Sequence, residues 1–171
     1  MKRNLFISSL LFLSVLMTLS SCSDNKEIAD NQETEFGTRE EANDLLTRAV
    51  NLVKANETVA FAMITAGTGG FSQKDLYPFC TTMKGVWIAH PRDVGSDFSD
   101  AETSDGVRVA ETMIKNAKVG EISEISYMLK RTGTTLYMLN GTGNSLDKEY
   151  KKTTLYTKVG KYICGSGYYE K

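Results

Sequence analysis

His90 is the only histidine of the chain, and it closes a stretch with the pattern of a β-hairpin. Two β-rich runs flank a Lys84-Gly85 turn, and a two-residue turn there predicts that Cys80 pairs with Ala89 across the hairpin. An imidazole can donate hydrogen bonds to a carboxylate and can change its charge near neutral pH, so His90 is a candidate ligand-binding residue. The alternative is a structural imidazole that fixes the end of its strand.

Side chains alternate along a strand, so the hairpin is expected to have two chemically different faces. One face is expected to be aromatic with an imidazole at its end, and it would hold Tyr77, Phe79, Ile88 and His90. The opposite face would hold Cys80, Thr82, Trp87 and Ala89. We interpret the aromatic face as one wall of a small pocket, and we expect Trp87 to pack against a long helix on the other side.

The sequence lacks the residue patterns of common catalytic and metal sites. A cysteine nucleophile needs a histidine partner, and Cys80 is expected on the face away from His90. There is no Cys-x-x-Cys pair, haem attachment motif or nucleophile elbow, and the histidine and cysteines do not make a zinc ligand set. The acidic stretch 92–106 lacks the ligand spacing of a calcium loop, which favours a solvated loop. We therefore expect no enzymatic activity, no metal and no cofactor.

The first 22 residues resemble a bacterial lipoprotein signal. Lys2 and Arg3 form a basic start, an apolar run follows, and the run ends in Leu19-Ser-Ser-Cys22. Such a run is too short for a membrane-spanning helix. We expect export and a lipid on Cys22, which would hold the protein on the periplasmic or cell-surface side of a bacterial membrane. The alternative is an ordinary secretory signal with an incidental cysteine.

The rest of the chain is expected to be a tether followed by one domain. Residues 23–38 are mostly polar and acidic, and such a segment cannot bury enough apolar surface to order itself. Residues 39–171 suffice for a single domain with a core. The net charge is −1 and no basic stripe occurs, so nucleic acid is not an expected partner.

Cys80 and Cys164 both lie in β-like runs of this exported domain. An oxidising compartment favours a disulfide between them, provided that their strands are neighbours in register. The alternative is a pair of buried free thiols that act as small apolar residues.

The spacing of apolar residues predicts an α+β domain. The capping-box pattern from Thr38 to Glu41 predicts the start of a long helix. Shorter helices are expected at 57–65 and 107–117, with Gly120 as the stop of the second. Besides the hairpin, strands are expected at residues 121–130, 135–139, 153–159 and 162–169, with a turn at 140–145. This order indicates an antiparallel sheet with helices packed on it.

Short motifs along residues 39–171 occur in the order of a known family. They are Gly70-Phe71, Asp75-Leu76-Tyr77-Pro78-Phe79, Gly85-Val86-Trp87-Ile88-Ala89-His90-Pro91, Val94-Gly95, Asp105-Gly106, Glu124-Ile125-Ser126-Tyr127, Lys152-Thr153-Thr154 and Gly165-Ser166-Gly167-Tyr168-Tyr169. Together they resemble the single Cache domains, the extracytoplasmic ligand-sensing modules of bacterial chemoreceptors and sensor kinases.

The resemblance implies a PAS-like five-stranded antiparallel sheet. A long N-terminal helix would lie along one face, and short helices and loops would close over a small-molecule pocket on the other. By residue matching, the ligand-binding positions are Tyr77, His90, Tyr127 and Lys152, and family ligands are often organic acids or amino acids. Lys152 would supply the counter-charge for an acid. The first and last strands would be neighbours, which also implies a Cys80–Cys164 disulfide.

Two features depart from the family pattern. Leu155 stands where members commonly carry a tyrosine, and the segment 128–151 is long. We expect both to touch the pocket rim, so the ligand class cannot be copied from the family.

The sequence therefore leads to two main functional hypotheses. The first is a lipid-tethered small-molecule-binding sensor module without an output region, which captures a polar metabolite such as a carboxylate and signals through a separate signalling or transport protein. The second is an envelope interaction or structural protein that kept the Cache fold without a ligand. An open cavity lined by both His90 and Lys152 would favour the first hypothesis. A pocket filled by the protein's own side chains would favour the second. A redox switch at Cys80 and Cys164 is a weaker third hypothesis.

Overall fold

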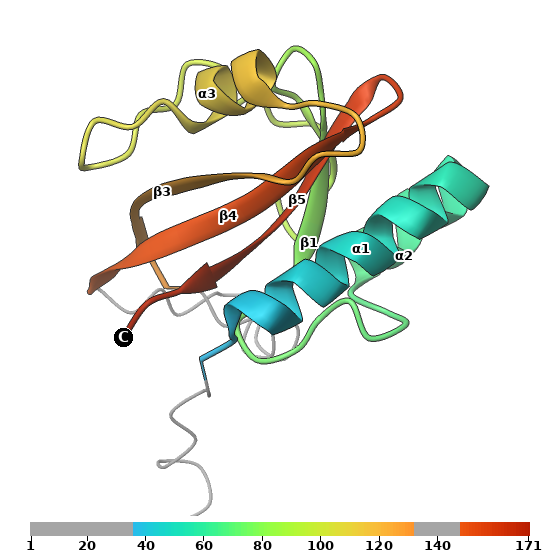
Figure 1. Cartoon of the computed structure of the whole chain (residues 1–171), viewed down its shortest axis with the longest axis horizontal. Coiled ribbons are helices and arrows are strands. Elements are labelled where there is room, and N and C mark those ends of the chain that lie inside the picture. Colours follow the sequence, from blue (N-terminus) through green and yellow to red (C-terminus); the bar gives the residue numbers. More distant parts are fainter. Residues whose placement is uncertain (1–35, 132–147) are drawn as a thin grey trace, which may run out of the picture. The chain divides into compact units, whose positions relative to one another are not determined.

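The computed structural model of the protein describes residues 36–131 and 148–171. Their strands are β1 (Pro78–Thr82), β2 (Trp87–Ala89), β3 (Ser123–Lys130), β4 (Glu149–Val159) and β5 (Tyr162–Tyr169). These form one sheet in the order β2-β1-β5-β4-β3, in which every neighbouring pair is antiparallel (Figure 1). The α+β fold expected from the sequence is therefore confirmed. The expected signal with Cys22, the strand at 135–139 and the turn at 140–145 lie outside the described residues.

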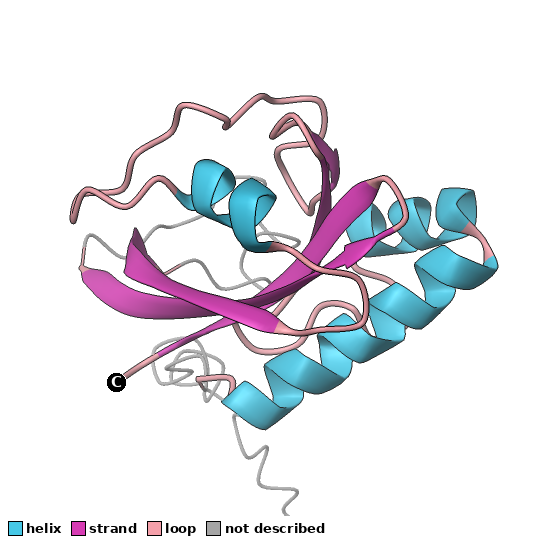
Figure 2. Ribbon diagram, turned by 45° about the horizontal axis from the view of Figure 1, so that its top comes forward, coloured by secondary structure: helices cyan, strands magenta, loops and turns pink. Residues whose placement is uncertain are grey.

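Helices cover both faces of the sheet. The long helix α1 (Arg39–Ala55) begins as predicted, because Thr38 Oγ1 accepts from the Glu41 N–H and the Glu41 carboxylate accepts from the Thr38 N–H. It packs with α2 (Glu57–Ala66) on one face, while α3 (Val109–Asn116) lies over the other (Figure 2). The helix α3 ends at Asn116, so Gly120 is not its stop. Gly120 instead adopts a positive φ of 80° in the turn before β3.

Each face of the sheet has its own apolar core. The helix-side cluster joins the apolar stripe of α1 to the sheet and consists of Ala42, Leu45, Leu46, Ala49, Val53, Ala60, Ile64, Phe71, Leu76, Cys80, Ala89, Leu155, Val159 and Cys164. The pocket-side cluster is more aromatic and consists of Tyr77, Phe79, Met113, Ile125, Tyr127, Tyr156 and Ile163. The site described below lies on the pocket side.

The predicted pairing of the hairpin is correct at Cys80 and shifted at Thr81. Cys80 pairs with Ala89 as predicted, but an irregularity follows and Thr81 pairs with Trp87. A bulge adds a residue to one strand and redirects the neighbouring side chains. Trp87 therefore packs with the pocket-side cluster and Ile88 with the helix-side cluster. The expectation that Trp87 packs against the long helix, with Ile88 on the pocket face, was wrong.

A disulfide joins β1 to β5. Cys80 and Cys164 lie directly opposite each other in the antiparallel pair, and their sulfur atoms are bonded. Both cysteines are fully buried in the helix-side cluster.

The ordered domain begins before residue 39. The Gly37 N–H donates to Asp75 Oδ1 (2.8 Å), and the Phe36 ring packs edge-on against Tyr150. Asp75 Oδ2 accepts from Arg131 Nε (2.6 Å), and the Arg131 guanidinium also lies 3.6 Å from the Phe36 ring centroid. The sequence assigned residues up to 38 to the tether, whereas these contacts make residues 36–38 part of the folded domain.

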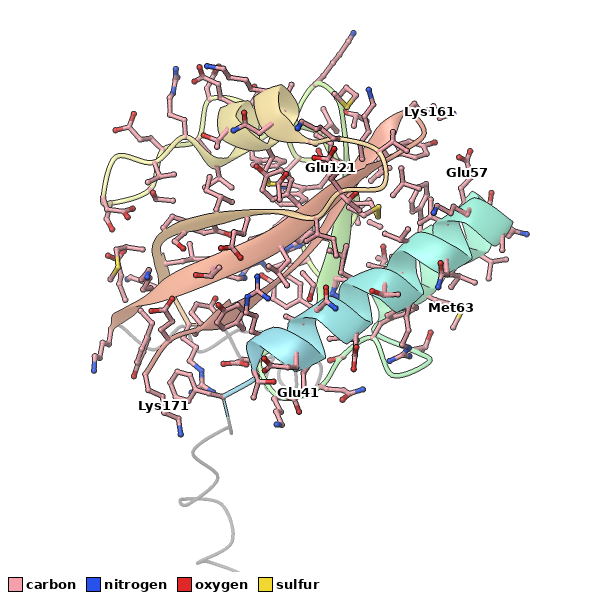
Figure 3. All side chains as sticks on the ribbon, viewed as in Figure 1. Glu41, Glu57, Met63, Glu121, Lys161 and Lys171 are labelled. Atoms are coloured by element: carbon pink, nitrogen blue, oxygen red, sulfur yellow. A yellow bond between two sulfur atoms is a disulfide. The ribbon has the colours of Figure 1, made fainter. Side chains whose placement is uncertain are left out.

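Charged side chains line the outer surface of the domain. Glu57 and Lys161 lie at the same end of it, with Oε1 and Nζ 3.8 Å apart (Figure 3). Such an exposed pair contributes little to stability. Within residues 36–131 and 148–171, no helix has the length and apolar character needed to cross a bilayer.

Candidate functional site

A cavity of about 470 Å³ lies on the pocket side of the sheet, beneath the loop that joins β2 to α3. It contains all four residues that the sequence assigned to a pocket. The lining residues are Tyr77, Phe79, Trp87, His90, Arg92, Asp93, Phe98, Ala101, Glu102, Thr103, Ser104, Val109, Tyr127, Met128, Leu129, Lys130, Glu149 and Lys152. The structure therefore brings together Tyr127 of β3, Lys152 of β4, Tyr77 just before β1 and His90 just after β2.

The β2–α3 loop is tied to the strands across the cavity. Ser104 Oγ donates to Glu149 Oε2 (2.5 Å), and the Met128 N–H donates to Asp105 Oδ1 (3.0 Å). Hydrogen bonds from the Thr103 hydroxyl and the Met128 N–H lower the pKa of Asp105, so its carboxylate stays charged. The acidic stretch thus encloses the cavity by bonding to β3 and β4.

Lys152 is a buried cation in the cavity wall. Only 2% of the residue is exposed. Its Nζ donates to Tyr77 Oη (3.1 Å) and lies 4.6 Å and 4.9 Å from the ring centroids of Tyr77 and Tyr169. Aromatic faces attract an ammonium group without neutralising its charge.

Among the described residues, no carboxylate forms an ion pair with Lys152. Burial lowers the pKa of Lys152, but the electrostatic influence of Tyr169, Tyr77 and Tyr127 and the hydrogen bond to Tyr77 outweigh it, so the pKa is raised. The side chain is therefore charged at neutral pH. Among the described residues, Lys152 Nζ makes one hydrogen bond, to Tyr77 Oη. An ammonium carries three N–H donors, so an anion that entered the cavity could accept from the other two.

Two glycines of β5 leave the space that these side chains need. A Cβ on Gly167 would lie 2.7 Å from Lys152 Cε and 2.6 Å from Thr154 Oγ1. A Cβ on Gly165 would lie 2.5 Å from Phe79 Cζ. Since such approaches are too close for real carbon atoms, β5 must be bare where Lys152 and Phe79 cross it.

The two ring nitrogens of His90 differ: Nδ1 is hydrogen-bonded to the backbone, and Nε2 has no partner among the described residues. Its Nδ1 accepts from the backbone N–H groups of Arg92 (3.2 Å) and Asp93 (3.1 Å). An accepting nitrogen carries no proton, so the proton of the neutral ring is on Nε2. No described group bonds to Nε2, and the residue lines the cavity. The structural alternative therefore holds for Nδ1, while Nε2–H remains a donor.

Burial keeps His90 uncharged at neutral pH. It lowers the pKa from 6.5 to about 4; the Asp93 carboxylate, 3.3 Å from Nδ1, raises the pKa, while Lys152 and Arg92 lower it further. The expectation that His90 changes charge near neutral pH is therefore wrong for the ligand-free protein. The ring can offer a ligand one hydrogen bond rather than two.

The two tyrosines complete the polar part of the wall. Tyr77 accepts the bond from Lys152 and packs edge-on against the His90 ring. Tyr127 Oη lies 2.9 Å from Thr154 Oγ1 in a buried hydrogen bond. Burial raises the pKa of Tyr127, so its hydroxyl is neutral. Both residues therefore present a hydrogen-bonding hydroxyl and flat apolar sides.

An aromatic wall that the sequence did not predict lies beside this polar part. The rings of Trp87 and Phe98 are stacked, with centroids 3.9 Å apart and planes inclined by 10°. Trp87 also contacts Phe79 edge-on and lies 4.8 Å from His90. The available signal was the isolated Phe98 within an acidic loop.

Comparison with known proteins supports the fold. A solved structure described as "Structural basis for carboxylic acid recognition by a Cache chemosensory domain" matches with a TM-score of 0.51 and 21% identity, over 77% of this chain and 88% of that chain. A second, described as "Periplasmic sensor domain of chemotaxis protein", matches with a TM-score of 0.50 and 16% identity, over 77% and 90%. The chain has a Cache fold. No family model and no curated protein matches the sequence.

The departures from the Cache pattern do not fill the cavity. Leu155 is buried in the helix-side cluster. Side chains alternate along β4, so Leu155 lies on the opposite face from Lys152, and the expectation that it touches the pocket rim was wrong. Of the long segment 128–151, residues 132–147 are outside the described part. The cavity between the described residues is open, and His90 and Lys152 both line it.

The described residues offer no metal centre beside this Cache-fold cavity. Within ranges 36–131 and 148–171, no three His, Cys, Asp or Glu side chains lie together as a metal site requires. Asp93 and Glu149, two of the carboxylates at the cavity, are already engaged with Arg92 and Ser104. Lys152 is the buried cation of the described cavity wall, and it has no carboxylate partner among the described residues.

Proposed function

We propose that this protein is an extracytoplasmic sensor module that binds a small carboxylate in its cavity. The observation that carries the proposal is the buried Lys152, which is charged and has no carboxylate partner among the described residues. A carboxylate is the complementary group, because it accepts charge-assisted hydrogen bonds from an ammonium. The Cache fold adds support, since one protein that shares it is described by its recognition of carboxylic acids.

Each cavity residue has a defined part in this proposal. Lys152 supplies the charge, and the Nε2–H of His90 donates to a polar atom of the ligand. Tyr77 orients the ammonium through its hydroxyl and, like Tyr127, presents a flat ring. No covalent step is involved, and the protein is proposed to be a binder rather than an enzyme.

Signalling would pass to a separate signalling or transport protein. The lipoprotein-like ending at Cys22 supports a lipid tether on the outer side of a bacterial membrane. Metabolic labelling with a tagged fatty acid tests this part. Label is expected on the wild-type chain and none on Cys22→Ser, whereas equal labelling would contradict the tether.

A thermal-shift screen tests ligand binding. The purified protein is heated with acetate, lactate, succinate or phenylacetate, and with the amide of each acid. An acid at about a hundred times its Kd stabilises the folded state by about 2.7 kcal/mol, which raises Tm by about 5–10 °C. At least one acid should do so, and its amide should not.

Two lysine variants assign the shift to the site. Lys152→Met keeps the length of the side chain and removes its charge, so the acid should no longer raise Tm. Lys151→Met is the matched control, because Lys151 is the exposed neighbour on the same strand. If the protein is folded and none of the acids changes its Tm, the proposal is contradicted. That result would favour the second hypothesis, an envelope interaction or structural protein.

A further inference from the structure

We propose that the ligand is an amphipathic monocarboxylic acid with a flat apolar body, rather than a two- or three-carbon acid. The inference rests on the proposed function and specifies its ligand. It comes from the division of the cavity into one charged position and one aromatic wall.

The cavity is larger than a short acid requires. Its volume is about 470 Å³, within the range of about 300–1,000 Å³ that is typical of sites for larger organic ligands. Acetate or lactate at Lys152 would leave most of that space to water in contact with aromatic rings. Apolar surface in contact with water is unfavourable, so a ligand that covers the rings binds more tightly.

The aromatic wall is held in place before a ligand arrives. The Trp87 N–H donates to the Ser96 carbonyl and the Gly95 N–H to the Trp87 carbonyl, at 3.0 Å and 2.8 Å. The Phe98 N–H donates to the Gly85 carbonyl at 2.9 Å. These bonds fix the backbone on both sides of the stacked rings. Both rings are only partly buried, so ring surface is left for a ligand.

The charges around the cavity favour a single carboxylate. Lys152 is the one buried cation among the described lining residues. Arg92 is exposed and bonds to Asp93 through Nε (3.0 Å). Glu149 bonds to Ser104. Arg92 and Lys130, the other cations of the described lining, are exposed, so the buried part of the wall matches an acid with one carboxylate and an apolar body.

The single tryptophan of the chain gives a direct readout. Trp87 is the only tryptophan and lines the cavity, so a ligand against it changes its emission in the unmodified protein. Acetate, phenylacetate, cyclohexylacetate and phenylacetamide are titrated while tryptophan fluorescence is recorded. Phenylacetate should bind at least about tenfold more tightly than acetate, because its ring is removed from water, and more tightly than cyclohexylacetate. Phenylacetamide should bind at least about tenfold more weakly than phenylacetate.

Phe98→Leu tests the wall itself. It keeps an apolar side chain and removes the flat ring, so the affinity for phenylacetate should fall by about fivefold while that for acetate stays unchanged. Val94→Ala is the control, since Val94 is exposed on the same loop and does not line the cavity. Equal affinities for acetate and phenylacetate would overturn this inference and leave the proposed function intact. Failure of every acid to bind would overturn both.

Discussion

The most informative single residue is Lys152, a buried lysine that has no carboxylate partner among the described residues. It places a charge in the interior, and the described groups around its ammonium are phenol rings and one hydroxyl. A buried charge with imperfect compensation is often replaced by an apolar side chain at no loss of stability. Its presence is therefore better explained by binding than by folding.

Lys152→Met should leave the ligand-free protein as stable as the wild type, or stabilise it by about 1–2 kcal/mol. The reason is that the variant removes a buried charge and keeps the volume of the side chain. Urea unfolding at neutral pH measures the difference. A loss of more than about 1 kcal/mol would mean that the contacts of the ammonium with Tyr77 and Tyr169 mainly serve the fold.

His90 should make stability depend on pH between 6.5 and about 4. Its folded-state pKa is lowered to about 4 by burial, so in that interval the unfolded chain binds a proton that the folded chain does not. The contribution of His90 to the free energy of unfolding is therefore fully present above pH 6.5. Below pH 6.5 the free energy of unfolding falls by about 1.4 kcal/mol per pH unit as the pH drops toward 4. Wild type and His90→Asn are compared by urea unfolding across this range.

His90→Asn separates the two nitrogens of the ring. The asparagine oxygen can replace Nδ1 as acceptor for the Arg92 and Asp93 N–H groups, and nothing replaces Nε2–H. The variant should be folded, should lose the extra pH dependence and should bind acids more weakly. His90→Gln, which places an amide nearer to Nε2, should bind acids better than the asparagine variant. Parallel pH profiles for His90→Asn and wild type would refute the assignment.

At the scale of elements, the glycines of β5 matter because they leave room for the side chains of neighbouring strands. Gly167→Ala should destabilise the protein by about 1–3 kcal/mol and weaken acid binding, because the new Cβ would meet Lys152 and Thr154. Ser166→Ala is the control on the same strand. Ser166 Oγ is buried and has no hydrogen-bond partner in the described part of the chain, so its removal should be neutral or stabilising. Wild-type binding by Gly167→Ala would show that Lys152 does not need the bare strand.

Local patterns predicted the elements, and long-range geometry decided the site. The capping box at Thr38 and the limits of β5 follow from adjacent residues. The face of Trp87 does not, because it depends on a bulge that a two-residue turn would not produce. The side of Leu155 follows from the alternation of side chains along β4, which the order of the family motifs does not contain.

At the scale of the whole domain, a buried ion pair joins three distant segments. Asp75 and Arg131 are almost completely buried, and Asp75 also binds the Gly37 N–H ahead of α1. Asp75 lies two residues before Tyr77, so the same clamp holds the chain entering the domain and the start of a cavity wall. The pair could not be predicted from sequence, because its members are 56 residues apart and neither has a local motif.

Asp75→Asn should destabilise the domain by about 3–5 kcal/mol, because the buried Arg131 guanidinium loses its ion pair with the Asp75 carboxylate. The double variant Asp75→Asn with Arg131→Met should recover part of that loss. Urea unfolding of the wild type, both single variants and the double variant gives the coupling energy. A coupling energy near zero would contradict a clamp.

The proposed carboxylate binding depends on the charge of Lys152 in the cavity. Isothermal titration calorimetry of the wild type and Lys152→Met, with phenylacetate and with phenylacetamide, tests this most directly. Phenylacetate should bind the wild type about 30-fold or more tightly than the variant, since a buried charge pair is lost, while the amide should bind both proteins weakly and alike. Equal affinity of the acid for both proteins would contradict the account.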